Sequence, residues 1–201
     1  MSRPSSVPPP FTVLLVCTGN ICRSALAERL GRAFLAQTLG EDAGQVRVVS
    51  AGTRAVVDSA MHPDSALVLR GFGAEAGDFR ARQLLDGMAT EADLTLTMTR
   101  AHRRDVLQRD PRVLARTFTL REAADLIGRL DDASIDGATL PERARKLVQL
   151  MAAARSERHG GENDDVRDPI GQPLEVHDEV GTVIVETLLP VLRRIADQRI
   201  R

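Results

Sequence analysis

The chain has 201 residues, of which 43% are hydrophobic, and its 27 basic and 28 acidic residues leave a formal net charge of −1. This balance attracts neither nucleic acid nor an anionic membrane, so any anion-binding site has to be local. No stretch approaches the about 20 consecutive apolar residues of a membrane-spanning helix, and the Pro-rich start lacks the apolar core of a signal peptide. We therefore expect a cytoplasmic protein without nucleic-acid or membrane partners.

The chain has two cysteines, Cys17 and Cys22, in one segment. Their number excludes a secreted disulfide framework and a four-cysteine zinc site. With no Trp, no Tyr and five Phe, the core must be aliphatic, and stacking on nucleic-acid bases is hard to build. The length favours one domain. We expect a flexible N-terminal segment at 1–10 and a single domain at 11–201.

The predicted elements alternate between strands and helices. Residues 11–17 form a continuous apolar, β-branched run, typical of a strand covered on both faces. A helix is expected to follow from Ser24, a good capping residue, because apolar residues then recur at helical spacing. Further along, the patterns predict strands at 46–51, 94–98 and 115–120 and helices at 63–70, 100–109, 122–129 and 141–157. This alternation implies a parallel α/β sheet with helices on both faces.

The last third of the chain is less regular. Residues 131–137 read as a polar break and residues 159–165 as a mobile acidic loop. A final helix should then be kinked or split at Pro190. Its expected inward stripe consists of Val180, Val183, Ile184, Leu188, Val191, Leu192 and Ile195.

The segment from Cys17 to Ser24 joins the first strand to the first helix. Free backbone N–H groups and the helix dipole at such a junction favour an anion and stabilise a thiolate, which makes Cys17 a candidate nucleophile. Arg23, six residues on, offers a planar fork of donors to two phosphate oxygens. Gly19 lets the backbone approach the anion, and Asn20 suits a left-handed position that turns amides inward. The Ser24 hydroxyl can stabilise the thiolate as a leaving group.

A plainer interpretation is that Cys17 merely ends a buried strand and Arg23 lies on the surface. The spacing of cysteine and arginine alone would favour it. The added glycine, asparagine and serine at a strand-to-helix junction favour a phosphate loop instead.

Leu15 to Ser24 resembles the signature of the low-molecular-weight protein tyrosine phosphatases. The stretches 50–53, 81–84 and 92–98 and the pair Asp168–Pro169 resemble further motifs of that family, in the same order. The resemblance implies a three-layer α/β fold with a four-stranded parallel sheet, a phosphate loop between the first strand and the first helix, and neither metal nor cofactor. It also implies the following roles: Cys17 as nucleophile, Arg23 as phosphate clamp, Asp168 as general acid, and Thr18, Gly19, Asn20, Ile21, Cys22, Ser24 and Ser50 as phosphate-binding or loop-supporting residues.

An acid is needed on chemical grounds as well, because expulsion of an alkoxide or phenoxide requires a proton that no loop residue is placed to give. Asp168 would then deprotonate the water that hydrolyses the phosphocysteine. An Asp-Pro pair is often just a turn, and Asp164 or Asp165 are alternative acids.

Cys22 has two interpretations. A disulfide with Cys17 would reversibly block and protect the nucleophile, and the resemblance implies such redox sensitivity. Alternatively, Cys22 is a small buried thiol that packs the loop. The histidines, His62, His102, His159 and His177, have no ligand spacing and are interpreted as surface or structural residues.

The resemblance has gaps that bear on the substrate. Ile170 and Gly171 stand where tyrosine-directed members carry an aromatic wall, and Ala25 replaces the usual proline after the loop. A helical insertion at about 131–161 has no counterpart in the compact family pattern. We hypothesise that its helix and the acidic loop after it shape the rim of the site. Ile21 resembles the tyrosine-directed members, since the arginine-directed type carries threonine there.

The sequence thus predicts a hydrolase that acts on phosphotyrosine-type phosphate through a phosphocysteine. Its partner is a phosphorylated protein or a small phosphoester, and we expect a monomer or weak dimer. Three alternatives stay open: an arsenate reductase, a phosphoarginine phosphatase, and a non-catalytic anion-binding module.

Overall fold

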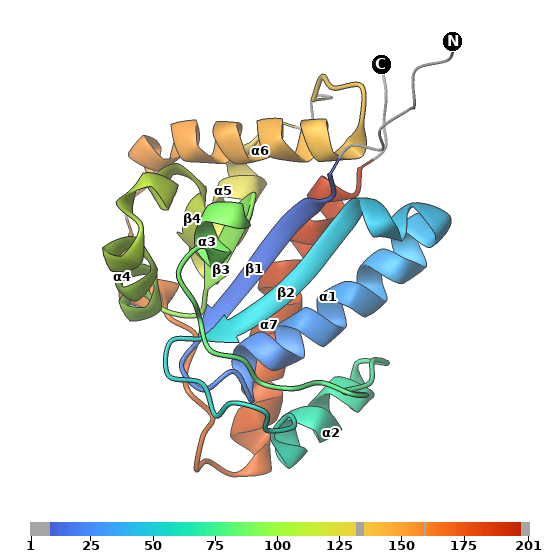
Figure 1. Ribbon diagram of the computed structural model, residues 1–201, viewed down its shortest axis with the longest axis vertical. Helices are drawn as coiled ribbons and strands as arrows, with labels where there is room; N and C mark the ends of the chain where they lie inside the picture. The colour runs from blue at the N-terminus through green and yellow to red at the C-terminus, as the bar shows by residue number, and fades with distance from the viewer. Residues whose placement is uncertain (1–8, 132–134, 159, 198–201) are drawn as a thin grey trace.

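Four parallel strands form one sheet in the order β2-β1-β3-β4. They are β1 (Phe11–Cys17), β2 (Val46–Gly52), β3 (Leu94–Thr97) and β4 (Thr117–Thr119). The register of the central pair runs from Phe11 opposite Val46 to Cys17 opposite Gly52. This computed structural model describes residues 9–131, 135–158 and 160–197, and Figure 1 shows their arrangement.

Helices lie on both faces of the sheet (Figure 1). They are α1 (Arg23–Leu39), α2 (Pro63–Gly71), α3 (Met88–Glu91), α4 (Arg100–Arg109), α5 (Leu120–Arg129), α6 (Leu140–Ala154) and α7 (Leu174–Ile195). Short 3-10 turns, η1 (Gly40–Gln45), η2 (Pro111–Arg116), η3 (Arg155–Glu157) and η4 (Glu162–Asp164), complete the described elements. The predicted parallel α/β fold with helices on both faces is confirmed.

The alternation of side chains along β1 divides the core into two layers. Phe11, Val13 and Leu15 belong to the larger cluster, which they share with buried residues of α1, α5 and α7. Leu14 and Val16 point to the other face and pack with buried residues of α3, α4 and η2. Every residue of β1 is buried, which explains why its sequence is continuously apolar rather than alternating.

Several predicted boundaries differ from those in the structure by one or a few residues. Ser24 does not cap α1, which begins at Arg23, so its side chain is free for the loop. The strand expected at 115–120 is shorter because η2 occupies residues up to Arg116 and α5 begins at Leu120, where Thr119 and Glu122 form a capping box. The short helix α3 was not predicted.

The helical insertion lies away from the strand end that carries the loop. Figure 1 shows α6 across the end of the sheet where β1 begins, whereas the loop follows the end of β1. Arg145 of α6 donates to Asp93 Oδ1 at 2.7 Å, and Asp93 Oδ2 accepts from the backbone of Thr12 at 2.9 Å. The hypothesis that α6 shapes the rim of the site was therefore wrong.

The chain returns to the site after α6. The backbone N–H of Val166 donates to Met98 O at 2.8 Å, beyond the end of β3. Two carboxylates of the expected acidic loop are engaged. Asp164 pairs with Arg158, and Asp165 accepts from the backbone N–H of Arg100 at 2.7 Å.

The last helix, α7, runs through Pro190 without splitting. Its predicted inward stripe is buried, except that Val183 is only partly buried. Among the residues that the structure describes, no helix is both long and apolar enough to cross a membrane. Residues 1–8 of the expected N-terminal segment, as well as His159, lie outside the described residues.

Candidate active site

The loop from Cys17 to Ser24 lies at the end of β1, and its carbonyl groups are held by neighbouring segments. The backbone N–H groups of Thr53, Arg54 and Val56 donate to the carbonyls of Cys17, Thr18 and Gly19 at 2.9–3.0 Å. Within each planar peptide the C=O and the next N–H point in opposite directions. Fixing these carbonyls outward therefore turns the following amides toward the inside of the loop, where an anion would lie.

The glycine that packing requires is Gly52 rather than Gly19. A Cβ atom at Gly52 would lie 2.4 Å from Thr18 O, which real side chains do not tolerate. At Gly19 a Cβ would make only ordinary contacts, 3.5 Å to Ile21 and 3.7 Å to Val56. The close approach between the loop and the turn after β2 therefore depends on Gly52.

Asn20 holds the loop from within. Its φ of 55° is left-handed, as its residue type suggested. The side-chain Nδ2 donates to Ser24 Oγ at 2.9 Å and to Ser50 Oγ at 2.8 Å, while Oδ1 accepts from the backbone N–H of Arg82 at 2.8 Å. Since Asn20 and both serines are fully buried, these bonds are shielded from competition with water.

Donors and acceptors in this hydrogen-bond network can be assigned, because it runs from the Glu28 carboxylate to the Cys17 sulfur. Ser50 Oγ lies 2.6 Å from Glu28 Oε2, and an ionised carboxylate only accepts, so Ser50 donates to Glu28. Asn20 donates to Ser24, which frees the Ser24 hydroxyl proton for Cys17 Sγ at 2.9 Å. The backbone N–H of Asn20 also points at Cys17 Sγ, at 3.3 Å. Both interactions stabilise a thiolate at Cys17.

Glu28 is a buried carboxylate that the sequence analysis did not single out. Arg82 and Arg32 neutralise it, with ion-pair distances of 3.0 Å and 2.8 Å. Arg82 also donates from Nε to Ser50 O at 2.7 Å. The segment 81–84, noted only as a resemblance, therefore fastens β2 to the loop.

Arg23 and Asp168 meet across 145 positions of sequence. Arg23 Nη2 donates to Asp168 Oδ2 at 2.6 Å and Nη1 to Val166 O at 3.0 Å. Arg23 is buried, whereas 49% of the Asp168 side chain is exposed. Asp168 Oδ1 accepts from the backbone N–H of Ile170 at 3.2 Å, which shapes the Asp-Pro turn. The cation thus lies inside the loop and the carboxylate at its mouth.

The alternative acids are engaged elsewhere. The guanidinium of Arg158 holds the pKa of Asp164 below its usual range, and Asp164 is buried. Asp165 accepts from the start of α4. Of the three candidates, Asp168 is the one bonded to Arg23.

His102 has a place at the site that was not predicted. Its Nε2 lies 2.8 Å from Thr18 Oγ1 and its Nδ1 lies 2.9 Å from the hydroxyl of Thr99, which caps α4. Burial, followed by the charge of Arg23, lowers the pKa of His102 to about 4, so the ring is neutral at pH 7. The only sequence signal was a Thr-x-x-His pattern at the end of a predicted strand.

Cys22 is buried next to Arg23 and free, as is Cys17. Burial raises the pKa of Cys22 to about 11 despite a hydrogen bond with Ser65, so it is a neutral thiol in the reduced protein. This fits the interpretation as a packing thiol. The disulfide with Cys17 stays a prediction.

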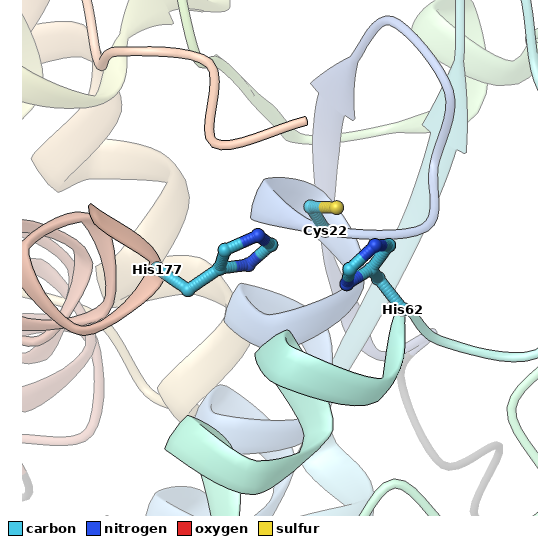
Figure 2. Close-up of side chains that lie close together, drawn as sticks. All are labelled: Cys22, His62 and His177. Atoms are coloured by element: carbon cyan, nitrogen blue, oxygen red, sulfur yellow. The ribbon is translucent and has the colours of Figure 1, made fainter. Parts of the chain in front are cut away.

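The described histidines fit the interpretation as surface or structural residues, but two of them also meet in space. His102 and His177 are buried, and the rings of His62 and His177 stack with their centroids 4.8 Å apart. Their ring atoms also lie close to Cys22 Sγ (Figure 2). Ile21 and Thr18 lie in the loop as expected. Ser50 and Asp168 are hydrogen-bonded to Asn20 and Arg23, so all predicted site residues lie in the loop or next to it.

A parallel sheet with a Cys-x5-Arg loop between its first strand and first helix defines a phosphatase-type α/β protein. The family model of the low molecular weight phosphotyrosine protein phosphatases matches residues 12–124. The chain belongs to this family of hydrolases.

Individual relatives agree with this assignment. A low molecular weight protein-tyrosine-phosphatase, Wzb of Salmonella typhi, is 30% identical over 152 residues, which cover 72% of this chain and 97% of Wzb. A probable phosphatase of the same kind, EpsP of Ralstonia solanacearum, is 35% identical over 111 residues, 55% of this chain and 71% of EpsP. The solved structure of the YwlE arginine phosphatase from Geobacillus stearothermophilus is 28% identical, with a TM-score of 0.63, and covers 93% of this chain and 91% of that one.

Proposed function

We propose that the protein hydrolyses phosphotyrosine-type monoesters at the loop from Cys17 to Ser24. The observation that carries the proposal is the meeting of Cys17, Ser24, Arg23 and Asp168, with Cys17 Sγ 2.9 Å from Ser24 Oγ and Arg23 bonded to Asp168 at 2.6 Å. Membership of the family supports a phosphocysteine mechanism.

In the first step the Cys17 thiolate attacks phosphorus, and an S–P bond forms as the P–O bond to the leaving group breaks. Arg23 and the loop amides bind the equatorial oxygens, whose charge repels a thiolate in the absence of such donors. Arg23 Nη2 is bonded to Asp168 Oδ2, so a phosphate oxygen that binds at Nη2 takes the place of that carboxylate. The released Asp168 carboxylate takes up a proton from solvent and gives it to the leaving oxygen.

In the second step water attacks the phosphocysteine and gives a proton to Asp168. The S–P bond breaks, inorganic phosphate leaves, and the Ser24 hydroxyl stabilises the departing thiolate. Thr18, held by His102, and Asn20 with Ser50 are positioning residues that keep the loop in shape.

The test is hydrolysis of p-nitrophenyl phosphate between about pH 5 and 8 with a chelator present. We expect Cys17→Ser to abolish turnover and Asp168→Ala to lower kcat by about 10²–10⁴-fold, the usual contribution of a positioned acid. Turnover that survives in Cys17→Ser, or none in the wild type, would overturn the proposal. In the second case, thiol-dependent arsenite formation and phosphate-dependent thermal stabilisation separate an arsenate reductase from an anion-binding module.

Phosphoarginine is a second candidate substrate, because the similarity to the YwlE arginine phosphatase extends over 93% of this chain. The flank of the loop is aliphatic, with exposed Val56 beside Gly19 and exposed Ile170 after Asp168. Ile21 stands where the resemblance associates threonine with arginine-directed enzymes. Comparing kcat/KM for phosphotyrosine and phosphoarginine peptides in the wild type and Ile21→Thr decides between them. A wild type that prefers phosphoarginine would contradict the phosphotyrosine assignment.

We further propose that residues 11–201 act as one domain, with the helical insertion at about 131–161 serving the end of the sheet far from the loop. We place the protein in the cytoplasm, because a thiolate nucleophile needs a compartment that keeps it reduced. We also propose that it is a monomer or a weak dimer. Sedimentation of the purified protein tests the oligomeric state.

A further inference from the structure

Three side chains from three helix starts converge behind the loop. Cys22 precedes α1, His62 precedes α2, and His177 lies in the first turn of α7. Each offers one ligand atom, and these atoms all lie within 4.8 Å of one another (Figure 2). The proposed mechanism uses none of the three, so their convergence needs another explanation.

His177 presents a buried nitrogen with an unused hydrogen-bonding capacity. The residue is 1% exposed, and its Nδ1 lies 3.0 Å from Ser65 Oγ. Its Nε2 is buried and makes no hydrogen bond of normal geometry among the described residues, although the Pro169 carbonyl lies beside the ring. An unpaired buried polar atom is costly and calls for a reason. If Nδ1–H donates to Ser65, Nε2 carries a free lone pair, which is how histidines that bind metals are oriented.

A carboxylate adjoins both rings. Asp64 Oδ2 lies 4.0 Å from His177 Nε2 and 3.9 Å from His62 Nδ1. The Asp64 side chain is 41% exposed and that of His62 29% exposed, so both can move and the group is open to solvent on that side. A negative charge here favours a cation between the histidines.

We propose that Cys22, His62 and His177 bind a divalent transition-metal ion of the zinc type, with Asp64 adjoining. One thiolate and two imidazoles are a donor set that zinc prefers, and three protein ligands leave a fourth position open to water or to Asp64. On binding, Cys22 releases its proton to solvent as the metal–sulfur bond forms.

The geometry shows what must move. Zinc bonds of about 2.0–2.3 Å in a tetrahedron place donor atoms roughly 3.3–3.6 Å apart. The donors now lie within 4.8 Å of one another, so the most distant of them must approach by up to about 1.2–1.5 Å. The rings must also leave their stack, which has an interplanar angle of 19°, because a bound ion lies near the plane of each ring. His62 is the ring that can turn, since its side chain is 29% exposed and, among the described residues, the one hydrogen bond to its ring is a long contact of 3.3 Å from the backbone N–H of Asp64.

A metal ion bound by Cys22 would be attached to the phosphate loop on the side away from the substrate. Cys22 is followed directly by Arg23, so the metal would tie the phosphate loop to α2 and α7. It would also sequester the Cys22 thiolate and prevent a disulfide with Cys17. The site goes beyond the proposed hydrolysis, and its test does not depend on turnover.

Cobalt(II) provides a direct probe, because a cobalt–thiolate bond gives a charge-transfer band in the near ultraviolet. The chain has neither Trp nor Tyr, so this region is nearly free of protein absorbance. We expect the band to appear in the wild type and in Cys17→Ser and to be lost in Cys22→Ser. A band that follows Cys17 instead would place the metal on the nucleophile and overturn the proposal.

Zinc titration by calorimetry tests the histidines. We expect His62→Gln and His177→Gln to weaken zinc binding by at least about 10-fold. Loss of a residue that only hydrogen-bonds a metal ligand already lowers metal affinity by about that factor. His102→Gln, a buried histidine outside the cluster, should bind zinc as the wild type does, and magnesium should not bind. His62 carries the test if His177→Gln fails to fold. No binding of zinc at micromolar concentrations, or equal affinity in His62→Gln, would refute the site.

Discussion

Asn20 combines a left-handed backbone, φ 55°, with three side-chain hydrogen bonds to Ser24, Ser50 and Arg82. The two contributions can be separated, because glycine keeps the backbone conformation and loses only the side chain. The same residue therefore lets strain and hydrogen bonding be measured independently at the centre of the loop.

We expect Asn20→Gly to lower the free energy of unfolding by about 2–3 kcal/mol, at about 1 kcal/mol for each lost bond. Asn20→Ala should lose roughly 1–2 kcal/mol more, since alanine resists the left-handed region. Urea unfolding of the three proteins measures both differences. Equal stability of the two variants would show that the backbone of residue 20 is not strained.

His102 makes the stability depend on pH. Its pKa is about 4 in the folded protein and about 6.5 when unfolded. Between these values the unfolded chain binds more protons, so stability falls as the pH is lowered from 6.5 to 4.

The contribution of His102 to this loss between pH 7 and 4.5 is about 2 kcal/mol. His102→Gln should therefore lose about that much less stability than the wild type over the same interval. Urea unfolding at the two pH values provides the measurement. His177, whose pKa burial also lowers, titrates in both proteins and cancels in the comparison. An identical loss in both proteins would mean that His102 is not held neutral.

At the scale of elements, the contact between α2 and α7 brings His62 next to His177. Gly181 of α7 makes it possible, because a Cβ there would lie 2.5 Å from Val68 Cγ1 and 3.0 Å from a ring carbon of Phe72. Gly128 of α5 offers a matched control, since a Cβ there would meet nothing within 4 Å.

We expect Gly181→Ala to destabilise the protein by about 1–3 kcal/mol through overpacking, after a partial offset from better helix propensity. Gly128→Ala should be neutral or stabilising by up to about 1 kcal/mol. Thermal or urea unfolding gives both values. If Gly181→Ala is as stable as Gly128→Ala, α7 does not pack as closely on α2 as the structure indicates.

At the scale of the molecule, the ion pair between Arg23 and Asp168 joins the first helix to the segment before the last one. We expect phosphate oxygens to compete with this carboxylate for Arg23 Nη2. Phosphate at 100 times its Kd should stabilise the folded protein by about 2.7 kcal/mol.

We expect Asp168→Asn to bind phosphate several-fold more tightly, because a like charge leaves the mouth of the loop, while turnover falls by about 10²–10⁴-fold. Arg23→Met should lose most of the stabilisation by phosphate. Thermal unfolding against phosphate concentration, with p-nitrophenyl phosphate turnover alongside, measures both effects. Weaker phosphate binding by Asp168→Asn would contradict the competition.

Features that depend on neighbours along the chain could be predicted from the amino-acid sequence. The continuous apolar run of β1, the alternation of strands and helices, and the loop with its left-handed Asn20 are local patterns, and each was predictable. The strand predicted at 115–120 was too long, because η2 extends to Arg116 and the capping box of Thr119 and Glu122 starts α5 at Leu120. Ser24 was wrongly expected to cap α1, which begins one residue earlier, at Arg23.

The tertiary structure alone decided what depends on distant contacts. Glu28, Arg82 and His102 support the loop from three separate elements, and their importance arises only when the sheet brings the ends of β1, β2 and β3 to one edge. The position of α6 at the opposite edge could not be read from its place before Asp168. Cys22, His62 and His177 are far apart in sequence and meet because α2 and α7 pack at Gly181. The sequence shows which side chains are chemically able to act, but which of them come together depends on how the helices and the sheet pack.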